Sequence, residues 1–117
     1  MKTVRVILSP EAEETYRNVQ QQAEKSKPAR SLSNAIQSKA DAIKANSHYG
    51  DPIAKPLIPA EYKTKYGITN LFRVKLPQFW RMRYHLTNAD TPDEVIALVV
   101  DIIDHPTYDK KFGYRGN

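Results

Sequence analysis

The stretch that most constrains the fold is FRVKLPQFWRMRY, residues 72–84, in which apolar and cationic side chains alternate on both sides of a short break. Because successive side chains of a β-strand point to opposite faces, this alternation predicts two strands that each have one apolar and one cationic face. A two-residue turn would place Lys75 opposite Trp80 and mix the two faces. A three-residue loop at 77–79 keeps the faces apart, so the stretch predicts a hairpin with that loop.

The register of this hairpin determines which side chains meet across the strands. The apolar pairs are Leu76 with Trp80, Val74 with Met82 and Phe72 with Tyr84, and the cationic pairs are Lys75 with Arg81 and Arg73 with Arg83. Like charges opposite one another destabilise a hairpin by tenths of a kcal/mol to about 1 kcal/mol per pair. The cationic face is therefore either a solvated outer surface or a binding site for phosphate groups, and Asp101 or Asp104 on a neighbouring strand could neutralise part of it.

The rest of the chain supplies the elements that complete this sheet. The expected elements are a strand over 2–9, a helix from Pro10 to about 26, a helix over 31–46, a proline-containing connection over 47–69 with one helical turn near 59–65, and strands over 70–76, 80–87 and 95–104. The last strand is apolar on both faces and should lie inside the sheet. The order β-α-α-β-β-β predicts an α+β fold, a single domain over 1–117 in which a helical hairpin packs on a four-stranded, mostly antiparallel sheet.

Positive charge is concentrated around the predicted hairpin. The chain of 117 residues has a net charge of +5, and between Tyr62 and Ala89 it contains six cations and no carboxylate. A local positive field of this kind suits a polyanionic partner, and a concave sheet face suits RNA better than a DNA duplex.

Several classes of site are excluded by the sequence. Cysteine is absent, which rules out disulfides, thiolate catalysis and thiolate zinc sites and favours a reducing compartment, the cytoplasm. No pair of His, Asp or Glu has the spacing of metal ligands, no glycine-rich phosphate loop or serine-centred motif is present, and no cofactor or metal is expected. The first apolar run is too short for a signal peptide or a membrane span, so we expect no membrane association.

Taken together, these segments resemble the RelE/ParE superfamily of toxins from bacterial and archaeal toxin–antitoxin pairs. The resemblance covers nearly the whole chain and runs through VRVILSPEAEE, HYGDPIAKPL, LFRVKLPQFWRMRY and DIIDHPTYDKKFGY. Members share a pattern close to YR(I/V)(R/K)…YR(L/V)(I/V)Y, which 72–75 and 80–84 match. The RelE branch consists of ribosome-dependent endonucleases that cleave messenger RNA, whereas the ParE branch poisons DNA gyrase on the same fold.

By position, the resemblance implies catalytic roles for basic residues of the hairpin strands and for residues after the last strand. The catalytic candidates are Arg73, Lys75, Arg81, His105 and Tyr108, with Phe112 and Tyr114 competing for the role of the aromatic residue. The candidates for RNA contacts are Arg83, Lys63, Lys65, Lys110, Lys111, Tyr114 and Arg115. Arg81 could stabilise the charge of a phosphorane, and His105 could act as acid or base because histidine titrates near neutrality.

The expected function is that of the toxin of a type II pair, a metal-independent endonuclease that inhibits translation through attack by the 2′-OH. Its expected partners are an acidic antitoxin protein, the ribosome and messenger RNA. Two alternatives stay open at this point. One is a non-catalytic binder on the same fold, such as a gyrase inhibitor or a degenerate toxin that only binds its antitoxin, and the other is a general RNA-binding domain.

Overall fold

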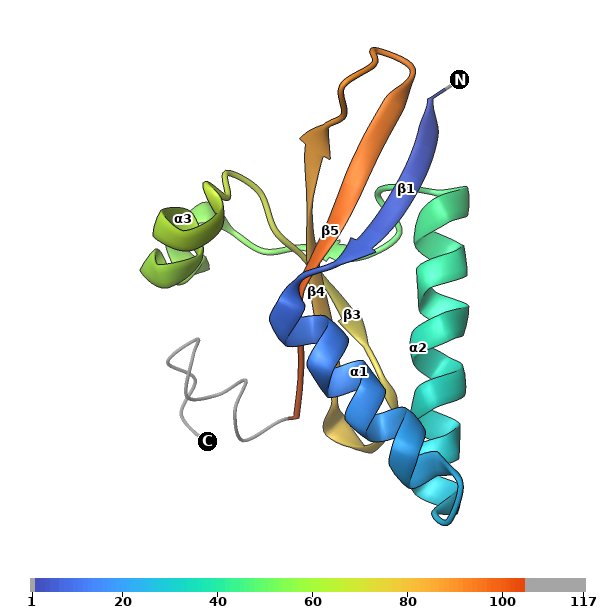
Figure 1. The fold of residues 1–117 in the computed structure, drawn as a ribbon. Helices are drawn as coiled ribbons and strands as arrows, with labels where there is room; N and C mark the ends of the chain where they lie inside the picture. Colours follow the sequence, from blue (N-terminus) through green and yellow to red (C-terminus); the bar gives the residue numbers. More distant parts are fainter. Residues whose placement is uncertain (1, 105–117) are drawn as a thin grey trace.

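The protein is built around one mixed β-sheet (Figure 1), and the computed structural model describes residues 2–104 of the chain. The strands are β1 (Thr3–Leu8), β2 (Asp51–Pro52), β3 (Phe72–Lys75), β4 (Arg81–Asn88) and β5 (Glu94–Ile103). They lie in the order β1-β5-β4-β3-β2, with β1 parallel to β5 and the other neighbouring pairs antiparallel. The α+β class is confirmed, but the predicted count of four strands is wrong, because the short β2 adds a fifth strand beside β3.

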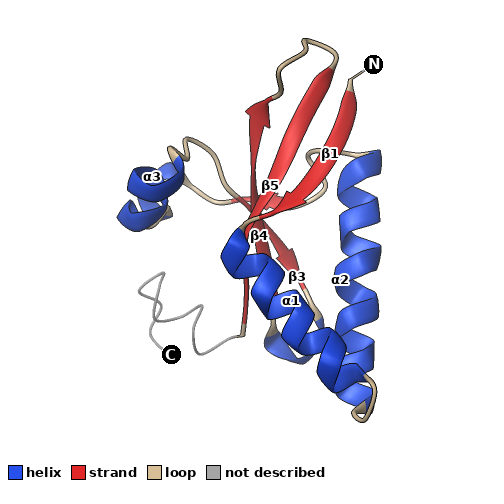
Figure 2. Ribbon diagram, viewed as in Figure 1, coloured by secondary structure: helices blue, strands red, loops and turns tan. Residues whose placement is uncertain are grey.

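Helices cover both faces of this sheet (Figure 2). The helical hairpin of α1 (Pro10–Ala23) and α2 (Lys27–Ala45) lies on one face, and α3 (Ala60–Tyr66) lies on the other. Two 3-10 turns, η1 (Lys55–Leu57) and η2 (Pro77–Phe79), complete the elements. The first turn precedes α3, and the second forms the loop between β3 and β4.

A serine cap explains where α2 begins. Ser26 Oγ accepts a hydrogen bond from Ala29 N at 3.2 Å, and Pro28 lies in the first turn of the helix. Proline is tolerated there because the first N–H groups of a helix have no acceptor within the helix. α2 therefore begins at Lys27, earlier than the predicted start at Ser31, since the proline starts the helix rather than interrupting the chain before it.

Each face of the sheet has its own hydrophobic core. The larger core lies between the sheet and the α1–α2 pair, and it includes Leu32 and Ile36 from α2 and Val74, Met82 and Tyr84 from the hairpin. The smaller core lies under α3 and consists of Ile58, Tyr62, Ile68, Leu71 and Val100. The apolar face predicted for the hairpin is thus confirmed as the face that carries the larger core.

A β-bulge in β5 brings an extra residue to the face that α3 covers. Arg83 pairs with Asp101, and the next residue of β4 pairs with Val99, so Val100 has no partner in β4. Val100 joins the core beneath α3, while the adjacent Asp101 accepts the hydroxyl hydrogen bond of Tyr62. The bulge therefore directs two consecutive side chains toward α3, which the alternation of a regular strand does not allow.

Candidate functional site

The β3–β4 hairpin has the predicted register. Lys75 lies opposite Arg81 and Arg73 opposite Arg83, and the loop between the strands is the predicted three-residue one at Pro77–Phe79. Two cations from each strand therefore share one face of the sheet, near the loop end of the hairpin.

Arg83 is fully buried, which corrects the expectation that it contacts RNA. Its side chain is 0% exposed, and its Nη2 lies 2.5 Å from Oδ1 of Asp101, which is also buried. The hydroxyl of Tyr62 donates to Oδ2 of the same carboxylate. A buried ion pair costs several kcal/mol in desolvation and persists only where geometry and further hydrogen bonds offset that cost. Of the two carboxylates that could have neutralised the cationic face, Asp101 is thus the partner of Arg83, and the pair is structural.

The other three cations of the hairpin retain access to solvent. Lys75 is exposed, and Arg73 is 31% exposed, with its Nη2 at 3.9 Å from Oδ2 of the exposed Asp51 on β2. Arg81 is partly buried, and its Nη1 donates to the carbonyl oxygen of the adjacent Trp80 at 2.8 Å. An ion pair with an exposed carboxylate at this distance contributes little. A positive surface therefore remains at the loop end of the hairpin.

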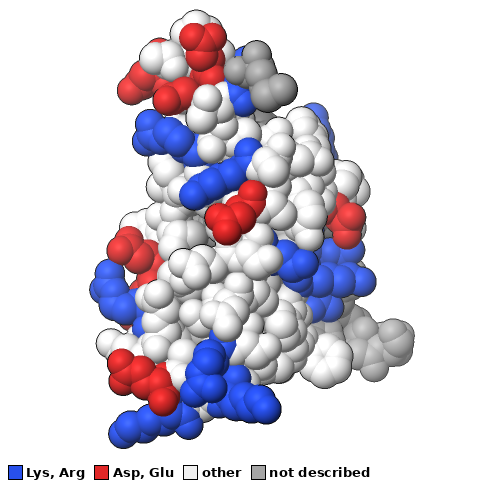
Figure 3. Space-filling model, turned by 90° about the vertical axis from the view of Figure 1, so that its right-hand side faces the viewer, with Lys and Arg blue, Asp and Glu red and all other residues white. Residues whose placement is uncertain are grey.

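A hollow of about 270 Å³ opens beside two of these cations, at the β2 edge of the sheet. Its lining residues are Lys39, Tyr49, Gly50, Asp51, Arg73, Val74 and Lys75. Lys39 of α2 donates from Nζ to the Tyr49 hydroxyl at 3.1 Å. The hollow thus combines three cations with one carboxylate, a set that favours an anionic group. In Figure 3, which views the molecule from the α2 side, Lys and Arg side chains gather at mid-height and again near the lower end.

Gly50 lets the loop after α2 approach β3 closely and so shapes this hollow. Gly50 N donates to the Tyr84 hydroxyl at 2.9 Å, and that hydroxyl donates to the carbonyl oxygen of Ser47 at 2.8 Å. A Cβ on Gly50 would lie 3.0 Å from the carbonyl oxygen of Arg73 and 3.0 Å from Cε1 of Tyr84. Burial raises the pKa of the Tyr84 hydroxyl above its usual value, so the group stays protonated and able to donate.

Lys39 was not among the predicted site residues. Its helix covers the apolar face of the hairpin, whereas Arg73 and Lys75 lie on the cationic face, and the two groups meet only at the edge of the sheet. The only local signal was the glycine at position 50, which marks a close approach of the backbone without saying to what.

Two other predicted RNA contacts, Lys63 and Lys65, do not join this surface. Lys63 and Lys65 are exposed on α3, and Figure 1 shows α3 to one side of the sheet at mid-height, whereas the β3–β4 loop lies near the lower end. The remaining candidates lie outside the described residues: His105, Tyr108, Lys110, Lys111, Tyr114 and Arg115, together with Phe112. The strand that leads to them ends at Ile103, which lies opposite Arg81.

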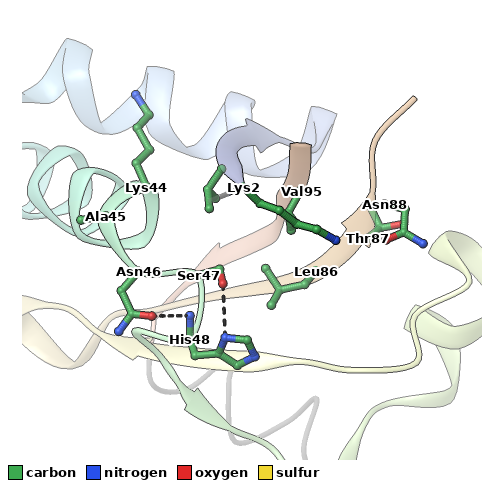
Figure 4. A pocket seen from close by; sticks show the side chains of 11 residues that line it. Lys2, Lys44, Ala45, Asn46, Ser47, His48, Leu86, Thr87, Asn88 and Val95 are labelled. Atoms are coloured by element: carbon green, nitrogen blue, oxygen red, sulfur yellow. Dashed lines mark hydrogen bonds between the residues drawn. The ribbon is translucent and has the colours of Figure 1, made fainter. Parts of the chain in front are cut away.

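A larger hollow of about 620 Å³ lies at the other end of the sheet, beside the C-terminal end of α2 (Figure 4). Its apolar lining includes Val4, Leu86 and Val95. The polar groups at its rim bond one another: Asn46 Oδ1 accepts from His48 N at 3.0 Å, and Ser47 Oγ lies 3.2 Å from His48 Nδ1. Figure 4 shows Lys44 pointing away from this group. Because its charges do not converge, this hollow is the weaker candidate for an anion site.

Within residues 2–104, no three His, Asp or Glu side chains lie close enough together to hold a metal ion. In the same part of the chain, no helix combines the length and the apolar character that crossing a membrane requires.

Comparison of the chain with protein families, with curated proteins and with solved structures found no match. The resemblance to RelE/ParE toxins therefore rests on the sequence motifs alone.

Proposed function

We propose that the protein is the toxin of a type II toxin–antitoxin pair and that it cleaves messenger RNA on the ribosome. The observation that supports this most is the arrangement of cations near the loop end of the β3–β4 hairpin, where Lys75 lies opposite Arg81 and Arg73 shares their face. Cations from two strands on one face can hold neighbouring phosphate groups of an RNA chain. β5 ends at Ile103, which lies opposite Arg81, so the described part of the chain ends beside these cations.

The proposed cleavage assigns one task to each group. The 2′-OH must lose a proton, the phosphorane charge must be stabilised, and the 5′-oxygen must gain a proton as it leaves. The guanidinium of Arg81 stays charged and can make two hydrogen bonds to the phosphorane, and Lys75 and Arg73 add to the positive field. In this scheme His105 acts either as the base that takes the proton from the 2′-OH or as the acid that protonates the 5′-oxygen, because histidine titrates near neutrality.

The proposed partners follow from the same charges. An acidic antitoxin protein covers the cations until the toxin is released, and the ribosome presents the messenger RNA, both in the cytoplasm. The run of six cations without a carboxylate between Tyr62 and Ala89 supports an acidic partner. Complementary charge also speeds such an association.

A non-catalytic binder on the same fold is the second candidate, and two contacts favour it. Arg83 is committed to Asp101, and Arg81 donates one hydrogen bond to the carbonyl oxygen of Trp80. A gyrase inhibitor, or a protein that only binds its antitoxin, needs no positioned transition-state donor. Expression without a partner separates the candidates, because an endonuclease stops protein synthesis first, whereas a gyrase poison causes DNA breaks while translation continues.

Replacement of Arg81 tests the catalytic proposal. We expect Arg81→Ala to lower messenger cleavage on programmed ribosomes by roughly 10²-fold, the usual loss for one transition-state donor. Arg81→Lys should restore little, because an ammonium group cannot make the planar two-point contact. The matched control is Arg17→Ala, which removes an exposed arginine that pairs with Glu13 on α1. Normal cleavage by a folded Arg81→Ala protein, with folding checked by thermal melting, contradicts the catalytic role.

A further inference from the structure

The loop between β3 and β4 holds two residues in a backbone conformation that L-amino acids avoid. Gln78 has φ 60° and ψ 33°, and Phe79 has φ 64°. Both lie in the left-handed region, where the Cβ of an L-amino acid crowds the following carbonyl oxygen. Glycine and asparagine adopt this conformation most readily. A chain that needed only a turn at this place would be more stable with glycine or asparagine at these positions.

Neighbouring contacts hold the loop in this conformation. Leu76 N donates to the carbonyl oxygen of Trp80 at 3.0 Å, and Trp80 N donates to that of Pro77 at 3.2 Å, which closes the loop. The side chain of Gln78 donates from Nε2 to the carbonyl oxygen of Pro28 at 2.8 Å, in the first turn of α2. Gln78 therefore anchors the loop to the helix, and this contact explains why a glutamine occupies the left-handed position 78.

Phe79 projects from the anchored loop. The residue is 69% exposed, more than Tyr49 at 41% or Leu57 at 47%. An aromatic side chain stabilises a fold chiefly through the area that it buries, and at this exposure the ring buries only a minor part of its surface. A strained backbone that presents an exposed side chain indicates a function for that side chain.

Cations lie on the elements that flank this loop. Lys75 and Arg81 are the cross-strand pair nearest the loop. On the other side the loop is bonded to the start of α2, where Lys27 and Arg30 are exposed. Figure 3 shows Lys and Arg side chains, with a smaller acidic group beside them, near the lower end of the molecule, where Figure 1 places the β3–β4 loop and the start of α2.

We infer that Phe79 is a stacking platform for an unpaired nucleobase of single-stranded RNA, and that the flanking cations hold the adjacent phosphates. This inference rests on the proposed function and adds how the messenger is held. An exposed aromatic ring on a loop that is flanked by cations matches a base joined to phosphates, and stacking accepts any base. A loop that is fixed before binding loses little conformational freedom when the base arrives. Duplex RNA is a poor ligand for it, because its bases are already stacked and paired.

Binding of the full-length protein to a short, fluorescein-labelled single-stranded RNA tests the platform. Phe79→Gly removes the ring and relieves the left-handed backbone, so we expect about tenfold weaker binding with an unchanged or higher melting temperature. Phe79→Tyr keeps the ring and should bind like the unchanged protein. Phe79→Leu keeps apolar bulk without a stacking face and should bind as weakly as Phe79→Gly. Leu57→Ala is the matched control, because Leu57 is also exposed but lies on η1.

Three results overturn the platform. The first is an affinity of Phe79→Gly for RNA that equals that of the unchanged protein. The second is Phe79→Leu binding as tightly as Phe79→Tyr, which indicates an apolar contact with a protein. The third is an unchanged protein that has no affinity for single-stranded RNA. Messenger cleavage by the same variants separates this inference from the proposed nuclease. RNA binding that depends on Phe79, without any cleavage, supports the stacking platform and contradicts the nuclease proposal. Cleavage together with an unchanged RNA affinity of Phe79→Gly supports the nuclease proposal and contradicts the platform.

Discussion

Arg83 and Lys75 lie on the same face of one hairpin, yet Arg83 is fully buried and Lys75 is exposed. Position along a strand determines the face of a side chain, but burial depends on the element that packs on that face. Tyr62 of α3 supplies this cover, because its hydroxyl binds the carboxylate of Asp101 that holds Arg83. Two residues of similar charge therefore have different roles, one structural and one available to a ligand.

Removal of one partner should show that the Arg83 pair is structural. We expect Arg83→Met to lower the free energy of unfolding by about 3 to 5 kcal/mol, because it leaves the buried carboxylate of Asp101 without its arginine. The double variant Arg83→Met/Asp101→Leu should recover much of this loss, since both buried charges are then absent. Urea unfolding measures both effects.

The control for this pair is an ion pair that retains contact with water. Arg5 lies 3.4 Å from the partly exposed carboxylate of Glu94, so Arg5→Met should cost less than about 1 kcal/mol. An Arg83→Met protein that is as stable as the starting protein contradicts the structural role of the pair.

His85 makes stability depend on pH. It lies in β4 opposite Leu98, and burial lowers its pKa below the usual value of histidine. Neutral His85 therefore contributes stability that is fully present above about pH 6.5, the usual pKa of a histidine in an unfolded chain, and that is lost as the pH falls below it. We expect His85→Gln to flatten the decline of the urea midpoint between about pH 7 and pH 5, whereas His48→Gln, on an exposed loop, should not. An equally steep decline in His85→Gln would assign the acid sensitivity to other groups.

At the scale of elements, the hairpin could be predicted because a local pattern specifies it. Alternation over 72–84 determined the faces and the register, and the length of the loop followed from them. β2 could not be predicted, because Asp51–Pro52 is too short to carry a pattern and pairs with β3 only through the close approach at Gly50. The bulge at Val100 could not be predicted from the sequence either, because β5 is apolar on both faces and a change of face does not alter its hydrophobic pattern.

The candidate site could be predicted only as far as its own strands. Lys75, Arg81 and Arg73 share a face as expected, but the burial of Arg83 depends on α3, and Lys39 reaches the hollow from α2. Such contacts join segments that lie far apart in the sequence, so no local pattern encodes them. The roles assigned to residues after 104 stay predictions.

The close approach of the loop to β3 should be sensitive to a single methyl group. We expect Gly50→Ala to lower the free energy of unfolding by about 1 to 3 kcal/mol, because its Cβ would lie 3.0 Å from a backbone oxygen of Arg73 that belongs to the sheet. Tyr84→Phe removes the hydroxyl that binds Gly50 N and should cost a similar amount. The double variant should lose less than the sum, since both changes loosen the same contact. An additive pair in urea unfolding would mean that the loop shifts independently of Tyr84.

At the scale of the whole molecule, the effect of the net charge of +5 depends on where the cations lie. Lys75 and Arg73 lie toward the β2 edge of the sheet, whereas β1 forms the opposite edge. Substitution of a cation near the β2 edge should therefore weaken the binding of a polyanion to the hairpin, whereas substitution at the β1 edge should not.

The salt dependence of RNA binding tests this asymmetry. The logarithm of the affinity for single-stranded RNA should fall linearly with the logarithm of the salt concentration, by about 0.7 for each phosphate contact. We expect Lys75→Ala to reduce this slope by about 0.7 and to weaken binding to all sequences alike. Arg5→Ala, on β1, should leave the slope unchanged. An unaltered slope in Lys75→Ala places the bound polyanion elsewhere on the molecule.

β5 lies between β1 and β4, and it is the last strand that the structure describes. Within residues 2–104, β1 joins the sheet only through β5. Ser9, just after β1, donates to the carbonyl oxygen of Val100, which lies 91 residues later in the sequence. While the ribosome is still adding residues 94–103, the first strand has no neighbour with which to pair, and closing so long a loop slows folding. The nascent chain therefore exposes its first strand until β5 has been made. The sheet of a protein with the proposed action on ribosomes would therefore close only after its own β5 has left the ribosome.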